Sequence, residues 1–544
     1  MGKRILKICH KYGLFYFAVL GTAELALYSL IRNAVLSRND GTPFIQSLYV
    51  HTFNLIAIIL IVLWILGYAL YLLNLSFRKK TGRRSLLIDS NRFKMGLFET
   101  YRFFLKANPF ELDTKPFKAE DWKQAEGVLF GYSGKKLIKL TSDSEANIFV
   151  CGSPGSAKTT SQVIPSAAQF AGSVLAVDIK GDIYAHNSGK RPIRRFAPDI
   201  PDAASLSAHY NPFYGFDQLS ESELKLRVAS MSMILLPDLG EKEPYFRNTA
   251  RKLFCGILLY LLSLVPNLTF PEFLSAVLHG TPPAQFPLPH FPKSIFDWIE
   301  TICYDTAHLC PAAKEQVVGL LGNNEKNISG VFDNLTSALV HFSNPVLNTL
   351  LDGTGECITP ADLENGNDVY LQISQNNLEV YAPLFTLIIS DFLHYLANRP
   401  DFAAYRYNRP VLVILDEFPQ LTFPYQTINQ FLSTLRSKNV LMMIVCQSVS
   451  QLAKKYDNFG YQALLGNCTY QVCCRSNDEL TKQHFINLIG TKRSLRRNRS
   501  AGKVSAQEIQ IPVFAPEEYG NLTENAIVYF NGANIKVRKI KSYL

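Results

Sequence analysis

The sequence is short of charged residues for its length. Only 18% of its 544 residues are Asp, Glu, Lys or Arg, while 47% are hydrophobic. A typical soluble domain has roughly 25% charged residues, so this balance excludes wholesale disorder and indicates some membrane content. At roughly 150 residues per domain, the length corresponds to about three to four units and excludes a single small binding module.

Acidic residues are almost absent from the first 84 positions. Eleven Lys and Arg residues stand there against Glu24 and Asp40, so this stretch carries +9 of the net charge of +10. The rest of the chain is near neutral, and bulk charge therefore says little about nucleic-acid binding. The excess is typical of basic flanks that hold hydrophobic helices in a membrane.

Metal-binding patterns and internal repeats are also missing. The ten cysteines form no C-x-x-C pair, and no His-rich spacing accompanies them. Reduced thiols are the default expectation, which fits a cytoplasmic main body. Cys473 and Cys474 are adjacent in an expected strand and would point to opposite faces, so core packing is a better interpretation than a shared metal site.

Two apolar runs, at about 13–36 and 53–75, are each close to the roughly 20 residues that cross a bilayer as a helix. Basic residues precede the first and follow the second, so the positive-inside rule places both termini and the main body in the cytoplasm. We predict a two-pass membrane anchor over 1–84. A cleaved signal peptide or a buried helical hairpin are the alternatives. Glu24, in mid-span, favours a partner helix and hence oligomerisation.

From Asn147 onward, short β-branched runs alternate with helical stretches. The runs NIFVCG, SVLAVDIKG, VYLQIS, VLVILDEF and VLMMIVCQS are typical of buried parallel strands joined by right-handed crossovers. Between about 220 and 345 the strand signals disappear and helical runs take over. We predict an α/β domain in two parts, 85–219 and 346–544, around an all-helical insertion domain at 220–345. Residues 86–145 show no strong period and are expected to be a short approach to the first strands.

The strand NIFV runs directly into CGSPGSAKTT, which matches the phosphate-binding pattern G-x-x-x-x-G-K-[ST] at all but one position. Such a loop points backbone N–H groups at a triphosphate, while its lysine reaches the β- and γ-phosphates and its hydroxyl ligates Mg²⁺. Lys158 and Thr159 supply these groups. Ala157 replaces the second glycine, where a Cβ disfavours an unusual φ. The sequence predicts an ATP and Mg²⁺ site with the loop residues Gly152, Ser153, Pro154, Gly155, Ser156, Ala157, Lys158, Thr159 and Thr160.

The run VLVILDEF ends in an acidic pair, Asp416 and Glu417. At the carboxyl end of a parallel strand, Asp416 would hold the magnesium shell and Glu417 would orient and deprotonate the attacking water. A helix N-cap is the plainer alternative for a strand-end aspartate. Gln447 stands at the end of the next strand, where it is predicted to sense the γ-phosphate or to position the water. A turn residue is the alternative. Arg436 is either an arginine finger for a neighbouring subunit's ATP or a solvated helix end.

With these residues in place, the chain resembles the type IV secretion coupling proteins, the membrane-anchored ATPases of bacterial conjugation, which are related to the FtsK-type DNA translocases. The similarity spans almost the whole chain in one order: two N-terminal spans, GSPGSAKT, AVDIKGD, YNPF at 210–213, YFRNTARKLF at 245–254, LDEFPQL, CQSVSQL and the closing segment from IPVFAPEEY onward. The resemblance implies an α/β P-loop NTPase fold with a RecA-like or FtsK-like parallel sheet.

The same resemblance implies a homo-hexameric ring at the bacterial inner membrane, with ATP at each subunit interface. ATP hydrolysis would pump single-stranded DNA, attached to its relaxase, toward the inner-membrane components of the type IV secretion channel. Two rivals remain open: an FtsK-type chromosome translocase, whose extra spans, long linker and winged-helix domain are not evident here, and a receptor that docks protein effectors without moving DNA. Ala157 leaves a degenerate ATPase as a further alternative.

One strongly basic cluster stands in the body of the chain. The stretch TKRSLRRNRSAGK, at 491–503, contains six basic residues and no acidic one. A flexible loop of this charge would grip the phosphates of single-stranded DNA with a salt-dependent affinity and no base reading. A disordered surface loop or a contact with anionic lipid headgroups are the alternatives. The candidate DNA-binding residues are Lys492, Arg493, Arg496, Arg497 and Arg499, with Lys503 beside them.

Overall fold

The computed structural model describes residues 110–112, 121–238, 244–402, 408–500 and 503–542. The predicted membrane spans and the whole of 1–84 lie outside the described residues. The chain divides into two compact units, and every described residue belongs to the second, Pro109–Leu544.

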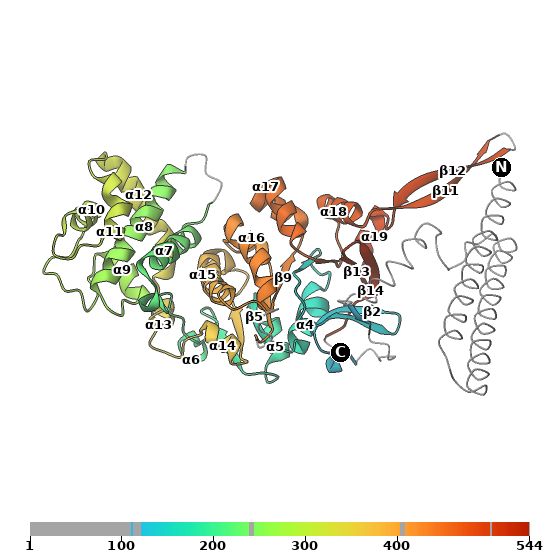
Figure 1. The fold of residues 1–544 in the computed structure, drawn as a ribbon, viewed down its shortest axis with the longest axis horizontal. Helices are drawn as coiled ribbons and strands as arrows, with labels where there is room; N and C mark the ends of the chain where they lie inside the picture. Colours follow the sequence, from blue (N-terminus) through green and yellow to red (C-terminus); the bar gives the residue numbers. More distant parts are fainter. Residues whose placement is uncertain (1–109, 113–120, 239–243, 403–407, 501–502, 543–544) are drawn as a thin grey trace, which may run out of the picture. The chain divides into compact units, whose positions relative to one another are not determined.

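A large sheet runs through this second unit (Figure 1). Neighbouring strands in its central part pair in parallel throughout. Five of them coincide with the runs that the sequence marks as buried strands, which confirms the predicted parallel α/β core. In order across the sheet, the parallel strands are β10 (Tyr470–Cys473), β4 (Ile148–Cys151), β9 (Val440–Cys446), β8 (Val411–Leu415), β5 (Ser173–Asp178), β7 (Asp368–Gln372) and β6 (Ile193–Phe196).

Beyond β10 the sheet continues with antiparallel pairs. From β10 outward these strands are β13 (Asn525–Phe530), β14 (Ala533–Arg538), β2 (Val128–Ser133), β3 (Lys136–Leu140) and β1 (Phe110–Leu112). The expectation of a mere approach segment at 86–145 was therefore incomplete. Almost all of β2 is buried, and its register with β3 shifts between Leu129 and Gly131. Neither feature leaves a period-2 pattern in the sequence.

Helices connect the parallel strands and pack against the sheet (Figure 1). The helix α15 is, among the described helices, the one long and apolar enough to cross a membrane, yet most of it is buried inside this unit. Its Leu384, Phe385 and Ile388 are fully buried in the shared hydrophobic core, as expected of a core helix. The longer helices of the sheet region are α15 (Leu378–Ala397), α16 (Tyr425–Thr434), α17 (Val449–Gly466) and α18 (Glu479–Ile489).

Helices occupy the range that the sequence marks as helical, and no strand lies among the described residues of 220–345. Capping boxes begin several of them, for example the box of Ser220 with Glu223. Arg227 in this group and Tyr210 both bond the carboxylate of Asp391 on α15, which ties the helices to the sheet region. The helices are α7 (Glu221–Leu235), α8 (Tyr245–Leu264), α9 (Phe270–His279), α10 (Ile295–Tyr304), α11 (Pro311–Val317), α12 (Glu325–Leu339) and α13 (Pro345–Leu350).

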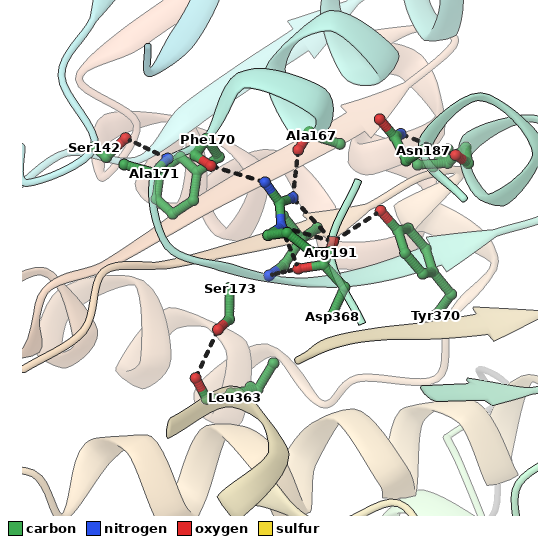
Figure 2. Close-up of polar contacts among 12 residues, drawn as sticks. Ser142, Ala167, Phe170, Ala171, Ser173, Asn187, Arg191, Leu363, Asp368 and Tyr370 are labelled. Carbon is green, nitrogen blue, oxygen red and sulfur yellow. Dashed lines mark hydrogen bonds and ion pairs between the residues drawn. The ribbon is translucent and has the colours of Figure 1, made fainter. Parts of the chain in front are cut away.

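A partly buried ion pair fastens the helix that follows the predicted phosphate-binding loop, α4 (Ile164–Gln169), to the sheet. Figure 2 shows Arg191 between the end of α4 and Asp368 at the start of β7. Its guanidinium donates to both oxygens of Asp368, at 2.9 and 3.0 Å, and to the carbonyls of Phe170 and Ala167, at 2.9 and 2.6 Å. Asp368 in turn accepts from the amide of Val174 on β5. The helix after the loop is thus held against two strands.

Candidate nucleotide-binding site

The predicted loop, the acidic pair and Gln447 meet where three neighbouring strands end. The strand order places β9 next to β4 and β8 one strand further, so Gly152, Gln447 and Asp416 follow adjacent carboxyl ends. Parallel strands bring their carboxyl ends to one edge, which is where α/β sheets bind ligands. The loop and the acidic pair therefore lie together, as the sequence predicted.

The loop is tightly packed at its start. A Cβ on Gly152 would lie 2.5 Å from Ser156 Oγ, 2.9 Å from Cys474 Cβ and 3.2 Å from the Arg475 amide nitrogen, so only glycine fits there. Ala157 has a φ of +62°, the left-handed region that an L-residue rarely adopts. The glycine of the ordinary pattern would adopt this φ without strain, so the sequence-based concern about Ala157 is confirmed in its geometry.

Lys158 and Thr159 lie where the loop becomes a helix. Lys158 is buried, and its Nζ donates to the Gly152 carbonyl at 2.6 Å, so the ammonium folds back over the loop. The helix starts with a π-helical turn, Thr159–Val163, and continues as α4. Pro165 lacks the N–H that an α-helical bond would need there, which accounts for the wider turn. The first N–H groups of a helix have no partner within it, and a helix start therefore favours an anion.

The carboxylate of Asp416 approaches the loop hydroxyl. Thr159 Oγ1 donates to Asp416 Oδ2 at 3.4 Å, which brings together the two side chains predicted to hold magnesium. Burial, and then the nearby charge of Glu417, raise the pKa of Asp416 to about 6. A divalent cation would relieve this penalty on the charged form. The pair fits Mg²⁺, whose remaining ligands would be phosphate oxygens and water.

Glu417 has a strained backbone and an unsatisfied oxygen. Its φ is +48°, and its amide donates to Asp416 Oδ1 at 3.0 Å. Gln447 Nε2 donates to Glu417 Oε1 at 3.0 Å, while Glu417 Oε2 is buried and has no partner among the described residues. Backbone strain beside an orphaned buried acceptor is a recognised mark of a functional position. The free oxygen fits the predicted role of orienting and deprotonating water.

Arg436 does not join this cluster within the chain. It lies in a 3₁₀ turn, Leu435–Lys438, which directly precedes β9, at the opposite edge of the sheet from the loop. Its proposed action on a neighbouring subunit stays a prediction, since a finger in trans would not need to face its own loop.

Two polar residues that the sequence did not assign to the site follow neighbouring strand ends. Asp178, at the end of β5, is buried and accepts from the amides of Ile183 and Tyr184, and burial raises its pKa. Arg475 follows β10 and touches the loop at Pro154. Their only sequence signal was a polar residue directly after an apolar run, which is too common to be decisive.

The basic stretch at 491–503 was expected to be a flexible loop, and this was wrong. It forms β11 (Thr491–Ser500), which pairs antiparallel with β12 (Lys503–Pro512) as a separate two-stranded ribbon. Five of the six basic residues lie on β11, which has no apolar alternation, so no strand pattern was visible. Lys492 and Arg493 are exposed, and Arg493 pairs loosely with Glu508 at 3.4 Å.

A phosphate-binding loop on one central parallel strand, facing an acidic pair two strands away, defines the P-loop NTPase-like class. The family model described as "Type IV secretory system Conjugative DNA transfer" matches residues 111–544. The chain belongs to this family, as the order of its sequence motifs indicated.

Two relatives match most of this chain. "Protein VirD4" of Agrobacterium fabrum is 26% identical over 456 residues, which cover 78% of this chain and 63% of the relative. "Conjugal transfer protein TraG" of Escherichia coli is 24% identical over 415 residues, covering 70% of this chain and 63% of the relative. The chain thus spans somewhat less than two thirds of the length of these curated relatives.

Solved structures agree with the fold. The bacterial conjugative coupling protein TrwBdeltaN70, in its unbound monoclinic form, has a TM-score of 0.57 at 15% identity, over 79% of this chain and 96% of that chain. The plasmid coupling protein TrwB in complex with ADP and Mg²⁺ has a TM-score of 0.56 at 15% identity, over 79% and 97%. At this identity the likeness shows the fold alone.

Proposed function

We propose that this chain is a membrane-anchored ATPase that couples a relaxase–DNA substrate to a type IV secretion channel and pumps single-stranded DNA in bacterial conjugation. Its family membership and its similarity to VirD4 and TraG support the conjugative role. The two apolar runs at 13–36 and 53–75 support an anchor in the bacterial inner membrane, with the body in the cytoplasm.

One observation carries the ATPase part of the proposal: the contact from Thr159 Oγ1 to Asp416 Oδ2, at 3.4 Å, beside the orphaned oxygen of Glu417. Lys158 and the loop amides would hold the phosphates, and Thr159 with Asp416 would hold Mg²⁺. When bound, magnesium would neutralise negative charge on the phosphates. Glu417 and Gln447 would position the attacking water, and Glu417 would accept its proton.

The DNA part of the proposal relies on charge. The β11–β12 ribbon carries the candidate phosphate-binding residues Lys492, Arg493, Arg496, Arg497 and Arg499 along one strand. A row of cations on a two-stranded ribbon suits contact with a nucleic-acid backbone and needs no base recognition. A homo-hexamer would place six ribbons and six nucleotide sites around one axis, with Arg436 acting across each interface.

The test uses the full-length chain in detergent, with ATP turnover measured with and without single-stranded DNA. We expect DNA to stimulate turnover, and we expect Lys158→Ala and Glu417→Gln to abolish it. Lys135→Ala, at an exposed lysine between β2 and β3, is the matched control and should turn over normally. Unchanged turnover in either site variant would remove the assignment of the site.

The DNA contact is tested separately. Replacing Arg496, Arg497 and Arg499 together with Ala should weaken binding of single-stranded DNA and flatten its salt dependence, because phosphate contacts release counterions. The double variant Lys135→Ala, Lys136→Ala should keep both. If the unaltered hexamer hydrolyses ATP with no response to DNA but responds to a protein substrate, the chain is instead a receptor for protein effectors.

A further inference from the structure

The strand β10, on the side of β4 away from the acidic pair, leads to a positively charged residue, Arg475, beside the loop. β10 pairs with β4 in parallel, with Cys473 opposite Cys151, and it lies on the other side of β4 from β9 and β8. The chain therefore leaves β10 beside the phosphate-binding loop, on the flank away from Asp416 and Glu417. Arg475 is the second residue after this strand.

Arg475 contacts the loop through its backbone and its side chain. Ser153 donates its amide to the Arg475 carbonyl at 2.7 Å, and Arg475 Nη2 donates to the Pro154 carbonyl at 3.1 Å. A Cβ on Gly155 would lie 3.7 Å from the same Nη2. The guanidinium thus lies over the outer turn of the loop.

The guanidinium keeps unused donors there. Its Nε is buried without a partner, and Arg475 forms no ion pair with a carboxylate of the described residues. Lys539 is a second cation nearby: its pKa is lowered by burial first, and the charge of Arg475 adds to this effect. Lys539 Nζ is already bound to the carbonyls of Leu522 and Thr523, at 2.7 and 2.9 Å. Of these two cations, Arg475 is therefore the one that still has hydrogen-bond donors for a ligand.

We propose that Arg475 binds the phosphate nearest the nucleoside, the α-phosphate of ATP or ADP. This inference rests on the proposed nucleotide site. The carboxylates and Thr159 mark the flank that takes the magnesium and the γ-phosphate. A phosphate chain that crosses the loop from that flank ends with its α-phosphate and nucleoside on the β10 flank. A guanidinium with free donors matches phosphate oxygens at that end.

The position predicts how Arg475 acts. The α-phosphate is common to ATP and ADP and does not change in the reaction, so its contact strengthens binding equally in the ground and transition states. Loss of such a contact raises KM and leaves kcat unchanged. A residue that only supported the loop would also displace Lys158 and Thr159, and kcat would fall with it.

Two variants separate charge from loop support. Arg475→Gln keeps a donor for the Pro154 carbonyl and removes the charge, whereas Arg475→Lys keeps the charge. In the full-length chain in detergent, calorimetric titration should show Arg475→Gln binding both ATP and ADP about tenfold to a hundredfold more weakly, as expected for one charged hydrogen bond. Its kcat should stay within about twofold, and Arg475→Lys should recover most of the affinity.

The outcomes are distinct. An Arg475→Gln protein that binds both nucleotides as tightly as the unaltered chain would overturn this inference alone, and so would a parallel fall in kcat. An unaltered chain that binds neither nucleotide would overturn the proposed function and this inference with it.

Discussion

Gln447 holds the acidic residue that ends the neighbouring strand: its Nε2 donates to Glu417 Oε1 at 3.0 Å, across the ends of β9 and β8. The bond leaves Glu417 Oε2 as the carboxylate oxygen that has no partner among the described residues. We expect Gln447→Ala to lower kcat about tenfold to a hundredfold, because the carboxylate loses its fixed orientation. Nucleotide affinity should hardly change, which a titration with ADP checks.

The matched control for this prediction is Gln483→Ala, at an exposed glutamine of α18. Its turnover should equal that of the unaltered chain. Equal turnover in Gln447→Ala would show instead that Gln447 is a turn residue, the alternative left open by the sequence.

Gly152→Ala should damage the loop. The added Cβ would lie 2.9 Å from Cys474 Cβ and 3.2 Å from the backbone nitrogen of Arg475, neither of which can rotate away. We expect nucleotide affinity to fall at least tenfold and stability to fall by about 1–3 kcal/mol. Gly466→Ala is the control, because a Cβ there meets nothing within 4 Å near the end of α17. Thermal unfolding and ADP titration should separate the two variants.

Ala157→Gly should relieve backbone strain in the loop and raise nucleotide affinity only modestly. The φ of +62° costs an alanine about 1–2 kcal/mol, so a glycine relieves this strain in the folded chain. The greater conformational freedom of glycine in the unfolded chain offsets roughly half of that stabilisation. We expect slightly higher stability and a gain in ADP affinity of less than about tenfold. A gain of a hundredfold or more in the same titration would mean that the natural Ala157 leaves a degenerate ATPase.

Much of the site could be predicted because its residues follow strands with strong sequence signals. β4 and β8 are short β-branched runs, and Gly152 and Asp416 follow them directly, so strand order alone brought the loop and the acidic pair together. The contact between Gln447 and Glu417 also follows from two strand ends, although their bonding needs the side-chain geometry.

The remainder depends on contacts between distant segments. Arg475 touches the loop because β10 pairs with β4, and a pairing across more than 300 residues leaves no local mark. The ribbon β11–β12 is defined by backbone pairing, and the sequence of β11 shows no apolar alternation, so periodicity cannot reveal it. Arg436 lies at the opposite edge of the sheet from its own loop, so a single chain does not test its predicted action on a neighbouring subunit.

Arg191→Met should destabilise the fold. Asp368 has only 2% of its side chain exposed, and the substitution would leave its charge buried without Arg191 (Figure 2). We expect a loss of about 3–5 kcal/mol, seen as a thermal midpoint several degrees lower. Lys225→Met, which breaks the exposed pair with Glu315, should leave the thermal midpoint almost unchanged, because solvent screens this pair. Equal midpoints for the two variants would contradict the role of the Arg191 pair.

The stability of the fold should fall in mild acid, partly through His394 on α15. Burial, and then the charge of Arg227, lower the pKa of His394 to about 4, and its Nε2 is buried with no partner in the part of the chain that the structure describes. The unfolded chain binds a proton near pH 6.5, whereas the folded chain stays neutral there until about pH 4. Stability is therefore fully present above pH 6.5 and is lost as the pH falls toward 4, by at most about 3 kcal/mol for this residue.

His394→Leu should flatten this loss in urea unfolding measured between pH 4 and 7.5. Part of the slope should persist, because His484, whose pKa burial also lowers to about 4, is unchanged in the variant. Replacing both histidines should flatten the curve further, since each neutral ring contributes its own proton difference between the folded and unfolded chains. Curves that stay parallel to that of the unaltered chain would mean that His394 takes up its proton within the folded protein.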